Sequence, residues 1–520
     1  MSMSAAPQTS DPLDSPRPAV AIDHEVVIIG SGFSGLGAAV ALRKMGIEDF
    51  LILEREEQLG GTWVQNDYPG LEVDMPFFIY SFPFAMKPDW SQVYPTGQEM
   101  KEYTLHCARE YDLVRRTRCA TTVERTEYDS DANVWRIRTE GGETIVTRYL
   151  VNATGLLVIP QMPDIEGIEG FEGKIIHSAR WDYDYDLTDK RVAVIGTGGT
   201  GIQLIPAIVD RVKRLDVYQR TAIWLLPKPN PRLSSAMKRV FRVAPFLQVF
   251  IRWLMNLFVE ISMGMGLVRY TSFPWIFNWI EKKIVERIRE QVDDPEIQEK
   301  LIPTYSFFCK RPSFSNVFYS IFNRSDVELI TDPIERVTAR GIVTEGGAVR
   351  EIDALICATG YHVFDRKCMP GYELIGRDGV ELGEFWEKNR FQAYEGATVP
   401  GFPNLFLFMG PYSAAGASYF TMIDTQGKHM TRCLREARKR GANFIEVKQE
   451  AHDRDFVKVN RRRGTMVLFG GSCGTSNSYY FDRHGDVPGL RPVTGFEHWL
   501  RSRFFSLGDY VFAKRSPRRD

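Results

Sequence analysis

The chain has 520 residues, of which 44% are hydrophobic, and this length exceeds what a single hydrophobic core usually supports. Two or three globular domains are therefore expected. The 65 Lys and Arg residues nearly cancel the 66 Asp and Glu residues, which argues against nucleic acid as a partner.

Residues 1–22 are rich in Ser, Pro, Ala and Asp, and they contain no basic start followed by an apolar run. This composition predicts a disordered leader rather than a signal peptide. The seven cysteines are scattered and form neither a CxxC pair nor a metal-ligand spacing. We therefore expect reduced, mostly structural thiols, no metal site, and a cytoplasmic protein that is not a disulfide reductase.

A first dinucleotide-binding motif follows the leader. A short apolar run leads directly into the turn Gly30-x-Gly32-x-x-Gly35, and helical periodicity follows this turn. Glu54 closes the next apolar run, where an acidic residue of a βαβ unit binds ribose hydroxyls. A glycine-rich turn can also serve packing alone, but the acidic residue in the expected place favours a cofactor.

The same pattern recurs downstream. An apolar run leads into Gly196-x-Gly198-x-x-Gly201, and the next predicted strand ends at Arg220 instead of an acidic residue. An arginine there suits the 2′-phosphate of NADP, so NADPH is expected rather than NADH. The alternative is that Arg220 is an ordinary surface cation. Two such sites predict a tightly held flavin and an exchangeable reductant, with O2 as the expected electron acceptor.

These motifs predict an α/β fold with two Rossmann-like domains and a helical insertion. Residues 231–302 change to helical patterns rich in Trp, Phe, Leu and Met. The expected boundaries are an FAD-binding domain over 23–156 and 395–520, an NADP-binding domain over 157–230 and 303–394, and the insertion over 231–302.

Residues 246–268 of the insertion are strongly apolar, but one polar stripe interrupts them. The stripe consists of Gln248, Arg252, Asn256 and Glu260, spaced four residues apart. A membrane-spanning helix would seldom tolerate it. We expect a core-packed helix that shields the flavin cleft; the alternative is a surface helix that makes peripheral membrane contact through residues 244–280. A large apolar substrate is compatible with both.

Three segments carry a family resemblance. Phe171-x-Gly173-x-x-x-His177-x-x-x-Trp181 resembles the FxGxxxHxxxW fingerprint of type I Baeyer–Villiger monooxygenases, which are class B flavoprotein monooxygenases. Related N-hydroxylating enzymes usually carry Tyr or Phe at the position of Trp181. The run from Gly60 to Trp63, with Asp74 after a Tyr-Pro-Gly turn, and the run Cys309-Lys310-Arg311-Pro312 are similar to two further motifs of this family.

The resemblance implies an activity: an FAD-dependent enzyme that uses NADPH and O2 to convert a ketone, bulky or lipophilic here, to an ester or lactone through a C4a-peroxyflavin. It also implies roles for individual residues. Flavin contacts are expected from Gly61, Thr62, Trp63, Asp74 and Tyr80; contact with the 2′-phosphate from Lys310; catalytic roles from Arg311, Asp74, His177 and Trp181.

Within these roles, Arg311 would stabilise the peroxide and the oxyanion, and Asp74 would pair with Arg311 and hold it in place. His177 and Trp181 would couple movement of the NADP domain to catalysis, although His177 can equally be a structural histidine. Residues 71–80 depart from the Arg-Cys-Asp pattern of many relatives, which leaves the substrate open. An N- or S-oxygenating flavin monooxygenase, and an NADPH oxidase or flavin reductase, are the alternatives.

Overall fold

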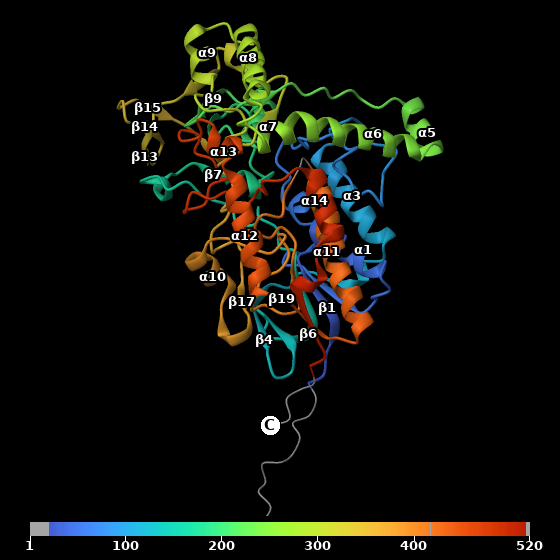
Figure 1. Cartoon of the computed structure of the whole chain (residues 1–520). Helices are drawn as coiled ribbons and strands as arrows, with labels where there is room; N and C mark the ends of the chain where they lie inside the picture. Colours follow the sequence, from blue (N-terminus) through green and yellow to red (C-terminus); the bar gives the residue numbers. More distant parts are fainter. Residues whose placement is uncertain (1–19, 416–417, 516–520) are drawn as a thin grey trace, which may run out of the picture.

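The computed structural model describes residues 20–415 and 418–515, so most of the predicted leader, residues 1–22, lies outside the described residues. The described chain folds into two domains, each built around a largely parallel sheet, with a helical segment across their common upper end (Figure 1). This arrangement confirms the expected α/β fold with two Rossmann-like domains.

The first domain contains an eight-stranded sheet in the order β17-β4-β5-β6-β1-β2-β3, with β18 paired to β6. Its strands are β1 (His24–Ile29), β2 (Phe50–Leu53), β3 (Thr117–Arg118), β4 (Val123–Asp129), β5 (Val134–Thr139), β6 (Thr144–Asn152), β17 (Glu373–Ile375) and β18 (Leu405–Leu407). Its helices are α1 (Phe33–Arg43), α2 (Thr62–Gln65), α3 (Gly97–Glu110), α10 (Leu382–Asn389), α11 (Tyr419–Arg440), α12 (Gln449–Arg463) and α14 (Gly495–Phe504). Helix α13 (Val467–Gly470), between the last two, packs in the core of the second domain. A separate two-stranded antiparallel sheet pairs β19 (Phe444–Val447) with β20 (Tyr510–Ala513).

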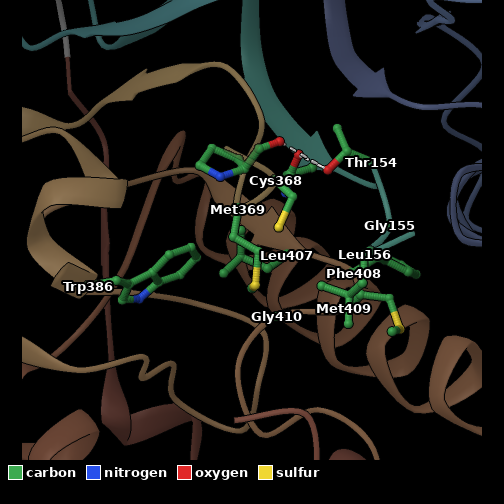
Figure 2. Close-up of a pocket in the computed structure, with 12 residues that line it drawn as sticks. Thr154, Gly155, Leu156, Cys368, Met369, Trp386, Leu407, Phe408, Met409 and Gly410 are labelled. Atoms are coloured by element: carbon green, nitrogen blue, oxygen red, sulfur yellow. Dashed lines mark hydrogen bonds between the residues drawn. The ribbon is translucent and has the colours of Figure 1, made fainter. Parts of the chain in front are cut away.

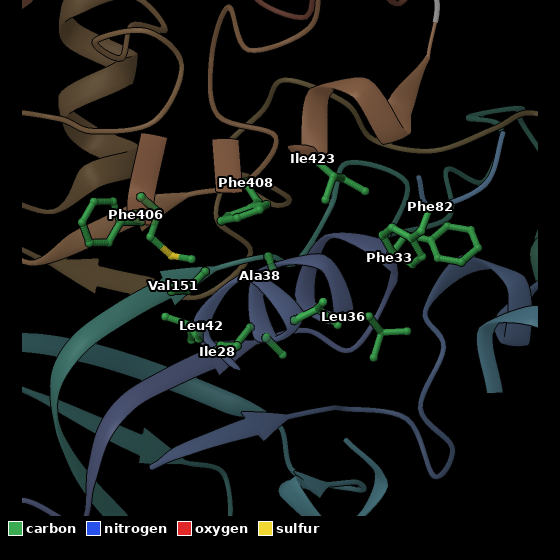
Figure 3. Close-up of a cluster of buried hydrophobic side chains, with 14 of the residues drawn as sticks. Ile28, Phe33, Leu36, Ala38, Leu42, Phe82, Val151, Phe406, Phe408 and Ile423 are labelled. Atoms are coloured by element: carbon green, nitrogen blue, oxygen red, sulfur yellow. The ribbon is translucent and has the colours of Figure 1, made fainter. Parts of the chain in front are cut away.

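The core of the first domain holds α1 between the sheet and α11. Figure 3 shows Ile28 and Val151 from the sheet, Ala38 and Leu42 from α1, and Ile423 from α11 in one buried cluster. A Cβ atom at Gly37 would stand 2.3 Å from Cγ2 of Ile423, so only glycine allows this close approach of the two helices. Because α11 comes from the C-terminal part of the chain, both ends of the sequence build this domain.

The second domain has a five-stranded parallel sheet in the order β12-β9-β8-β16-β7. Its strands are β7 (Lys174–His177), β8 (Arg191–Ile195), β9 (Arg214–Tyr218), β12 (Val327–Ile330) and β16 (Ala354–Cys357), and α4 (Gly201–Ile208) follows β8. Smaller sheets pair β10 (Leu225–Leu226) with β11 (Ser313–Phe314), and β13 (Ile334–Thr338) with β14 (Gly341–Thr344) and β15 (Val349–Glu351).

The chain returns to the first domain earlier than expected. The predicted boundary assigned residues 303–394 to the second domain, but β17 pairs with β4 of the first sheet. Phe364 and Trp386 are already buried in a first-domain core. The apolar runs alone could not show this, because a short strand such as β17 joins a sheet through long-range pairing.

The helical segment comprises α5 (Ser235–Val243), α6 (Pro245–Val259), a π-helical turn (Glu260–Gly264), α7 (Met265–Val268), α8 (Pro274–Gln291) and α9 (Pro295–Leu301). Helix α8 packs into the core of the second domain through Phe277, Ile280, Ile284 and Ile288, and α7 does so through Leu267 and Val268. In α6 the buried residues are Gln248 and Arg252; Leu247 and Ile251 are partly buried against the first-domain core, and most other apolar side chains face outward. The expectation of a core-packed helix is therefore wrong for α6.

The polar residues of α6 face inward because of the surface that this helix covers. Nη1 of Arg252 donates to the carbonyl oxygens of Phe78 at 3.1 Å and Ser81 at 2.8 Å, and Nε2 of Gln248 donates to that of Lys87 at 3.1 Å. Buried carbonyl groups need donors, and the polar stripe supplies them. The helix thus lies on the first domain, although its sequence is inserted in the second.

Candidate functional site

The first glycine turn leaves open space at the N-terminus of α1. Gly30 has a φ of +101°, and a Cβ atom there would stand 2.5 Å from the carbonyl oxygen of Ala153. A Cβ atom on Gly35 would stand 1.9 Å from that of Gly30, whereas one on Gly32 would meet no atom closer than 3.7 Å. The fold therefore requires the outer two glycines, and the middle one leaves room for a pyrophosphate beside the helix N-terminus.

Glu54 lies buried at the end of β2, beside this turn. Its Oε2 accepts hydrogen bonds from the backbone N–H and the hydroxyl of Ser31 at 2.9 and 2.6 Å. The Ser31 hydroxyl also accepts from the N–H of Gly60 at 3.0 Å, which ties the turn to the Gly60–Gly61 segment. Sequence reasoning missed Ser31, because its position inside a glycine motif carries no signal of its own.

The predicted flavin contacts lie together next to the first turn. A Cβ atom on Gly61 would stand 2.8 Å from Cα of Gly32, so the two glycine segments touch. Trp63 is buried and meets the ring of Tyr80 edge-on, with centroids 5.9 Å apart. Nε1 of Trp63 is buried and has no hydrogen-bond partner among the described residues. Such an orphaned donor fits a site that a polar cofactor completes.

The second turn repeats the geometry of the first. Gly196 has a φ of +110°, and its Cβ atom would stand 2.5 Å from the carbonyl oxygen of Ala358. A Cβ atom on Gly201 would stand 2.2 Å from that of Gly196, whereas one on Gly198 would meet nothing within 4 Å. The second domain therefore also has space for a pyrophosphate, at the N-terminus of α4.

Two cations lie together beside the second turn. Burial, followed by the nearby charge of Arg220, lowers the pKa of Lys310 to about 8. Within residues 20–415 and 418–515, neither side chain has a carboxylate oxygen within 4.0 Å. Two cations that repel each other and lack an acidic partner suit a doubly charged phosphate.

Arg311, the next residue, has Asp74 and Tyr80 of the first domain among its electrostatic neighbours. Desolvation by the surrounding protein lowers the pKa of Arg311. Interactions with Tyr479, Asp74 and Tyr480 outweigh this effect and raise the pKa above its usual value. Its side chain stays accessible to solvent. An accessible guanidinium among tyrosines and one carboxylate can stabilise negative charge on a bound ligand.

Asp74 does not form the expected ion pair with Arg311 at contact distance. Instead, Nε2 of Gln203 donates to Oδ1 of Asp74 at 3.3 Å, and Arg311 acts on Asp74 only through its charge. Burial raises the pKa of Asp74 although Arg311 and Lys228 lower it. The expected ion pair between Asp74 and Arg311 is therefore absent. The two residues belong to different domains, and Gln203 of α4 occupies the place beside Asp74.

Gln203 is the main residue that sequence reasoning missed. From α4 it also accepts from the hydroxyl of Tyr68 at 2.9 Å and from the N–H of Glu72 at 3.3 Å, and it donates to the carbonyl of Glu72 at 2.9 Å. It therefore joins the second domain to the segment that carries Asp74. Helical position alone could not reveal this, because the partners lie 129 to 135 residues away.

His177 and Trp181 lie in the segment that joins the two domains. His177 is buried at the end of β7, and its Nδ1 accepts from the N–H of Ala179 at 3.1 Å. Burial lowers its pKa. Its Nε2 is buried and has no hydrogen-bond partner among the described residues. Trp181 is half-buried, and its neighbour Arg180 forms an ion pair with Glu56 of the first domain at 3.3 Å.

A disulfide bond joins Cys309 to Cys473, so the expectation that all cysteines are reduced is wrong for this pair. The bond stands directly before Lys310, and Cys473 precedes the loop that brings Tyr479 to Arg311. Spacing along the chain could not reveal the pair, because its members are 164 residues apart. Cys107, Cys119, Cys357, Cys368 and Cys433 are free.

A small pocket opens beside the first turn, at the carboxyl ends of β6 and β18 (Figure 2). Thr154, Met369, Trp386 and Met409 are among its lining residues, and the hydroxyl of Thr154 donates to the carbonyl of Pro370 at 3.3 Å. None of the predicted catalytic residues lines it.

Known proteins resemble the chain over nearly its whole length. Residues 27–244 match the family described as pyridine nucleotide-disulphide oxidoreductase. A Baeyer–Villiger monooxygenase of Pseudomonas aeruginosa is 37% identical over 481 residues, which cover 92% of this chain and 88% of that protein. One of Streptomyces coelicolor is 34% identical over 495 residues, which cover 95% and 93%.

Solved structures agree with these sequence relatives. The crystal structure of OTEMO in complex with FAD and NADP is 26% identical, has a TM-score of 0.83, and covers 95% of this chain and 100% of its own. Since relatives at 34–37% identity span most of this chain and of their own length, the family that the fingerprint predicted is confirmed, and the chain belongs to the Baeyer–Villiger monooxygenases.

Proposed function

We propose that this enzyme uses FAD, NADPH and O2 to convert a bulky, lipophilic ketone to an ester or lactone. The observation that carries the proposal is the position of Arg311. Its guanidinium lies among Asp74, Tyr80 and Tyr479, and within the described chain no carboxylate stands within 4.0 Å of it. A cation in this state is available to a ligand.

The residues divide into two cofactor sites. Gly30, Gly32, Gly35 and Glu54 would hold the dinucleotide part of FAD, and Trp63 and Tyr80 its ring system; Gly196, Gly198, Gly201, Arg220 and Lys310 would hold NADPH. FAD, when bound, accepts hydride from NADPH and activates O2. The 2′-phosphate of NADPH would bind both Arg220 and Lys310, because its negative charge offsets the repulsion between the two cations.

Arg311 supplies a fixed positive charge where oxygen becomes negatively charged. A guanidinium keeps its charge at any working pH, and loss of one such donor typically costs about 3 kcal/mol of transition-state stabilisation. Asp74 limits the net charge around Arg311, and Gln203 fixes the position of Asp74. Movement of the second domain would change the contacts of Gln203. The hydrogen bond that Asp74 accepts would therefore change with that movement. His177 and Trp181 would act through the same joint.

The experiment is NADPH consumption by the FAD-loaded protein in air, with cyclic, linear and aromatic ketones of increasing size. An amine and a sulfide serve as comparison substrates, and products are identified by mass spectrometry. Ester or lactone, rising with the apolar size of the ketone, is expected. N- or S-oxides alone, or hydrogen peroxide alone, would contradict the proposal.

The expected peripheral membrane contact through residues 244–280 also stays a proposal, and so does a cytoplasmic location with access to lipid. The outward-facing apolar side chains of α6 support the contact. A ketone that partitions into lipid would then be concentrated where the enzyme rests.

A further inference from the structure

The outer face of α5, α6 and the following π turn is a continuous series of exposed apolar side chains. We call it the apolar face; its members are Val240, Val243, Phe246, Val249, Phe250, Trp253, Leu254, Leu257, Phe258 and Ile261. Phe246 and Phe258 are each 68% exposed, and Trp253 is 58% exposed. An exposed apolar surface of this extent marks an interaction site.

We infer that the apolar face docks onto the surface of a lipid bilayer that contains anionic lipids. The helix from Pro245 to Val268 has a mean hydropathy of 1.4, only 6% of its apolar window is buried, and it is long and apolar enough to cross a membrane. Trp and Phe side chains are typical of helices that lie at the boundary between headgroups and acyl chains. The inference deepens the proposed function, since it names where a lipophilic ketone would be met.

The polar stripe decides between lying on the bilayer and crossing it. Arg252 and Gln248 donate to first-domain carbonyl groups, and the Glu260 carboxylate accepts from the N–H of Gly495 at 3.1 Å and of Phe496 at 3.4 Å. These bonds fasten the helix to the first domain along its length (Figure 1). A crossing helix would have to break them all, so α6 lies parallel to the membrane plane.

The charges around the apolar face favour anionic lipid over a neutral apolar partner. Residues 232–283 contain eight Lys and Arg residues and two acidic residues. Among the cations, Arg239, Arg242 and Arg269 are exposed. Both acidic side chains are engaged inward, Glu260 with α14 and Glu281 with the N–H of Phe307 at 2.6 Å. A positive rim around an apolar centre is complementary to anionic headgroups above acyl chains.

The apolar face also stands directly behind the site. Phe241 of α5 packs against Phe77 and Phe78, with ring centroids 6.4 and 5.7 Å apart. Those residues follow Asp74 and precede Tyr80 in one segment, and Arg252 holds that segment from the other side. Insertion of α5 and α6 into a bilayer would therefore bring the Asp74–Tyr80 segment to the lipid surface.

Vesicle co-sedimentation with the FAD-loaded full chain tests the inference without requiring turnover. We expect binding to vesicles of phosphatidylcholine with phosphatidylglycerol, weaker binding to pure phosphatidylcholine, and release by high salt. The variant F250S/W253S/F258S should lose at least about tenfold in binding, because three exposed aromatic side chains no longer insert. In the unaltered protein, brominated lipids should quench fluorescence, and W253F should reduce that quenching.

The matched control is V349S/V457S/V511S, which replaces exposed apolar residues on other elements and should bind vesicles like the unaltered protein. Retained flavin absorbance and turnover of a small, water-soluble ketone show that each variant is folded. No binding of the unaltered protein to anionic vesicles would overturn the inference. The inference would also be overturned if light scattering showed a dimer that the variant F250S/W253S/F258S converts to a monomer. A second copy of the chain would then cover the apolar face. Vesicle binding by an enzyme that forms no ester would refute only the proposed reaction.

Discussion

Burial and a neighbouring charge together set the pH at which Lys310 loses its proton. Burial and Arg220 depress its pKa to about 8, so the ammonium form is present below that pH and is lost as the pH rises through it. We expect the affinity for NADP+ to fall several-fold between pH 7 and pH 9, because the 2′-phosphate loses a cationic partner. Calorimetric titration across this range measures it.

Two comparisons isolate the cause. NAD+ lacks the 2′-phosphate, so its weaker binding should change little over the same pH range. Arg220→Gln removes the charge that, together with burial, lowers the pKa of Lys310. The fall in NADP+ affinity should therefore move to higher pH. A pH-independent affinity for NADP+ in the unaltered protein would remove Lys310 from the phosphate site.

Arg311 is expected to separate reduction from oxygenation. Arg311→Ala should keep FAD and still be reduced by NADPH, but ketone oxidation should fall by about 100-fold, because the only fixed cation proposed to face the reacting oxygen is gone. Stopped-flow flavin absorbance and product analysis measure the two steps separately. Arg220→Ala is the contrasting variant, with weaker NADPH binding and intact oxygenation at saturation. Full ketone oxidation by Arg311→Ala would exclude the proposed role.

At the scale of elements, the two turns use glycine for two different reasons. Gly201 is required by the fold, whereas Gly198 has free space around it. Gly198→Ala should leave the free energy of unfolding unchanged and weaken NADP+ binding at least about tenfold, because the new methyl group occupies the pyrophosphate space. Gly201→Ala should destabilise the protein by about 2 kcal/mol or more. Denaturant unfolding and calorimetry give both quantities.

Gly346 provides the control for this pair, since a Cβ atom there would meet nothing within 4 Å and the residue is remote from both turns. Gly346→Ala should change neither quantity. Equal NADP+ affinity in Gly198→Ala and the unaltered protein would mean that the pyrophosphate does not approach this turn.

In the molecule as a whole, the Cys309–Cys473 bond links the loop that carries Lys310 and Arg311 to the loop of Tyr479. Cys309→Ser should lower the free energy of unfolding by about 2–4 kcal/mol, because a long chain segment is no longer closed. It should also lower ketone oxidation, since Tyr479 no longer stays beside Arg311. Urea unfolding with and without reductant measures the first effect.

Reduction of the unaltered protein should reproduce the effect of Cys309→Ser, and reductant should add nothing to the variant. Cys119→Ser, a half-buried free thiol, should behave like the unaltered protein. Equal stability with and without reductant would show that the bond does not contribute to folding.

The amino-acid sequence was sufficient to predict the fold class, both glycine turns and the family. These features are local: a turn that needs positive φ or close backbone approach demands glycine at fixed spacing, whatever surrounds it. The return of the chain to the first domain near Phe364 could not be predicted, because strand pairing between distant segments leaves no periodic signal.

Which side of α6 faces inward depends on packing between distant parts of the chain. Helical periodicity predicts a polar stripe and an apolar face, but it says nothing of the surface beneath the helix. Here that surface presents the carbonyl groups of Phe78 and Ser81, so the polar stripe is buried and the apolar face is exposed. Gln203 and the Cys309–Cys473 bond were decided in the same way, because their partners are neighbours only after the two domains have packed together.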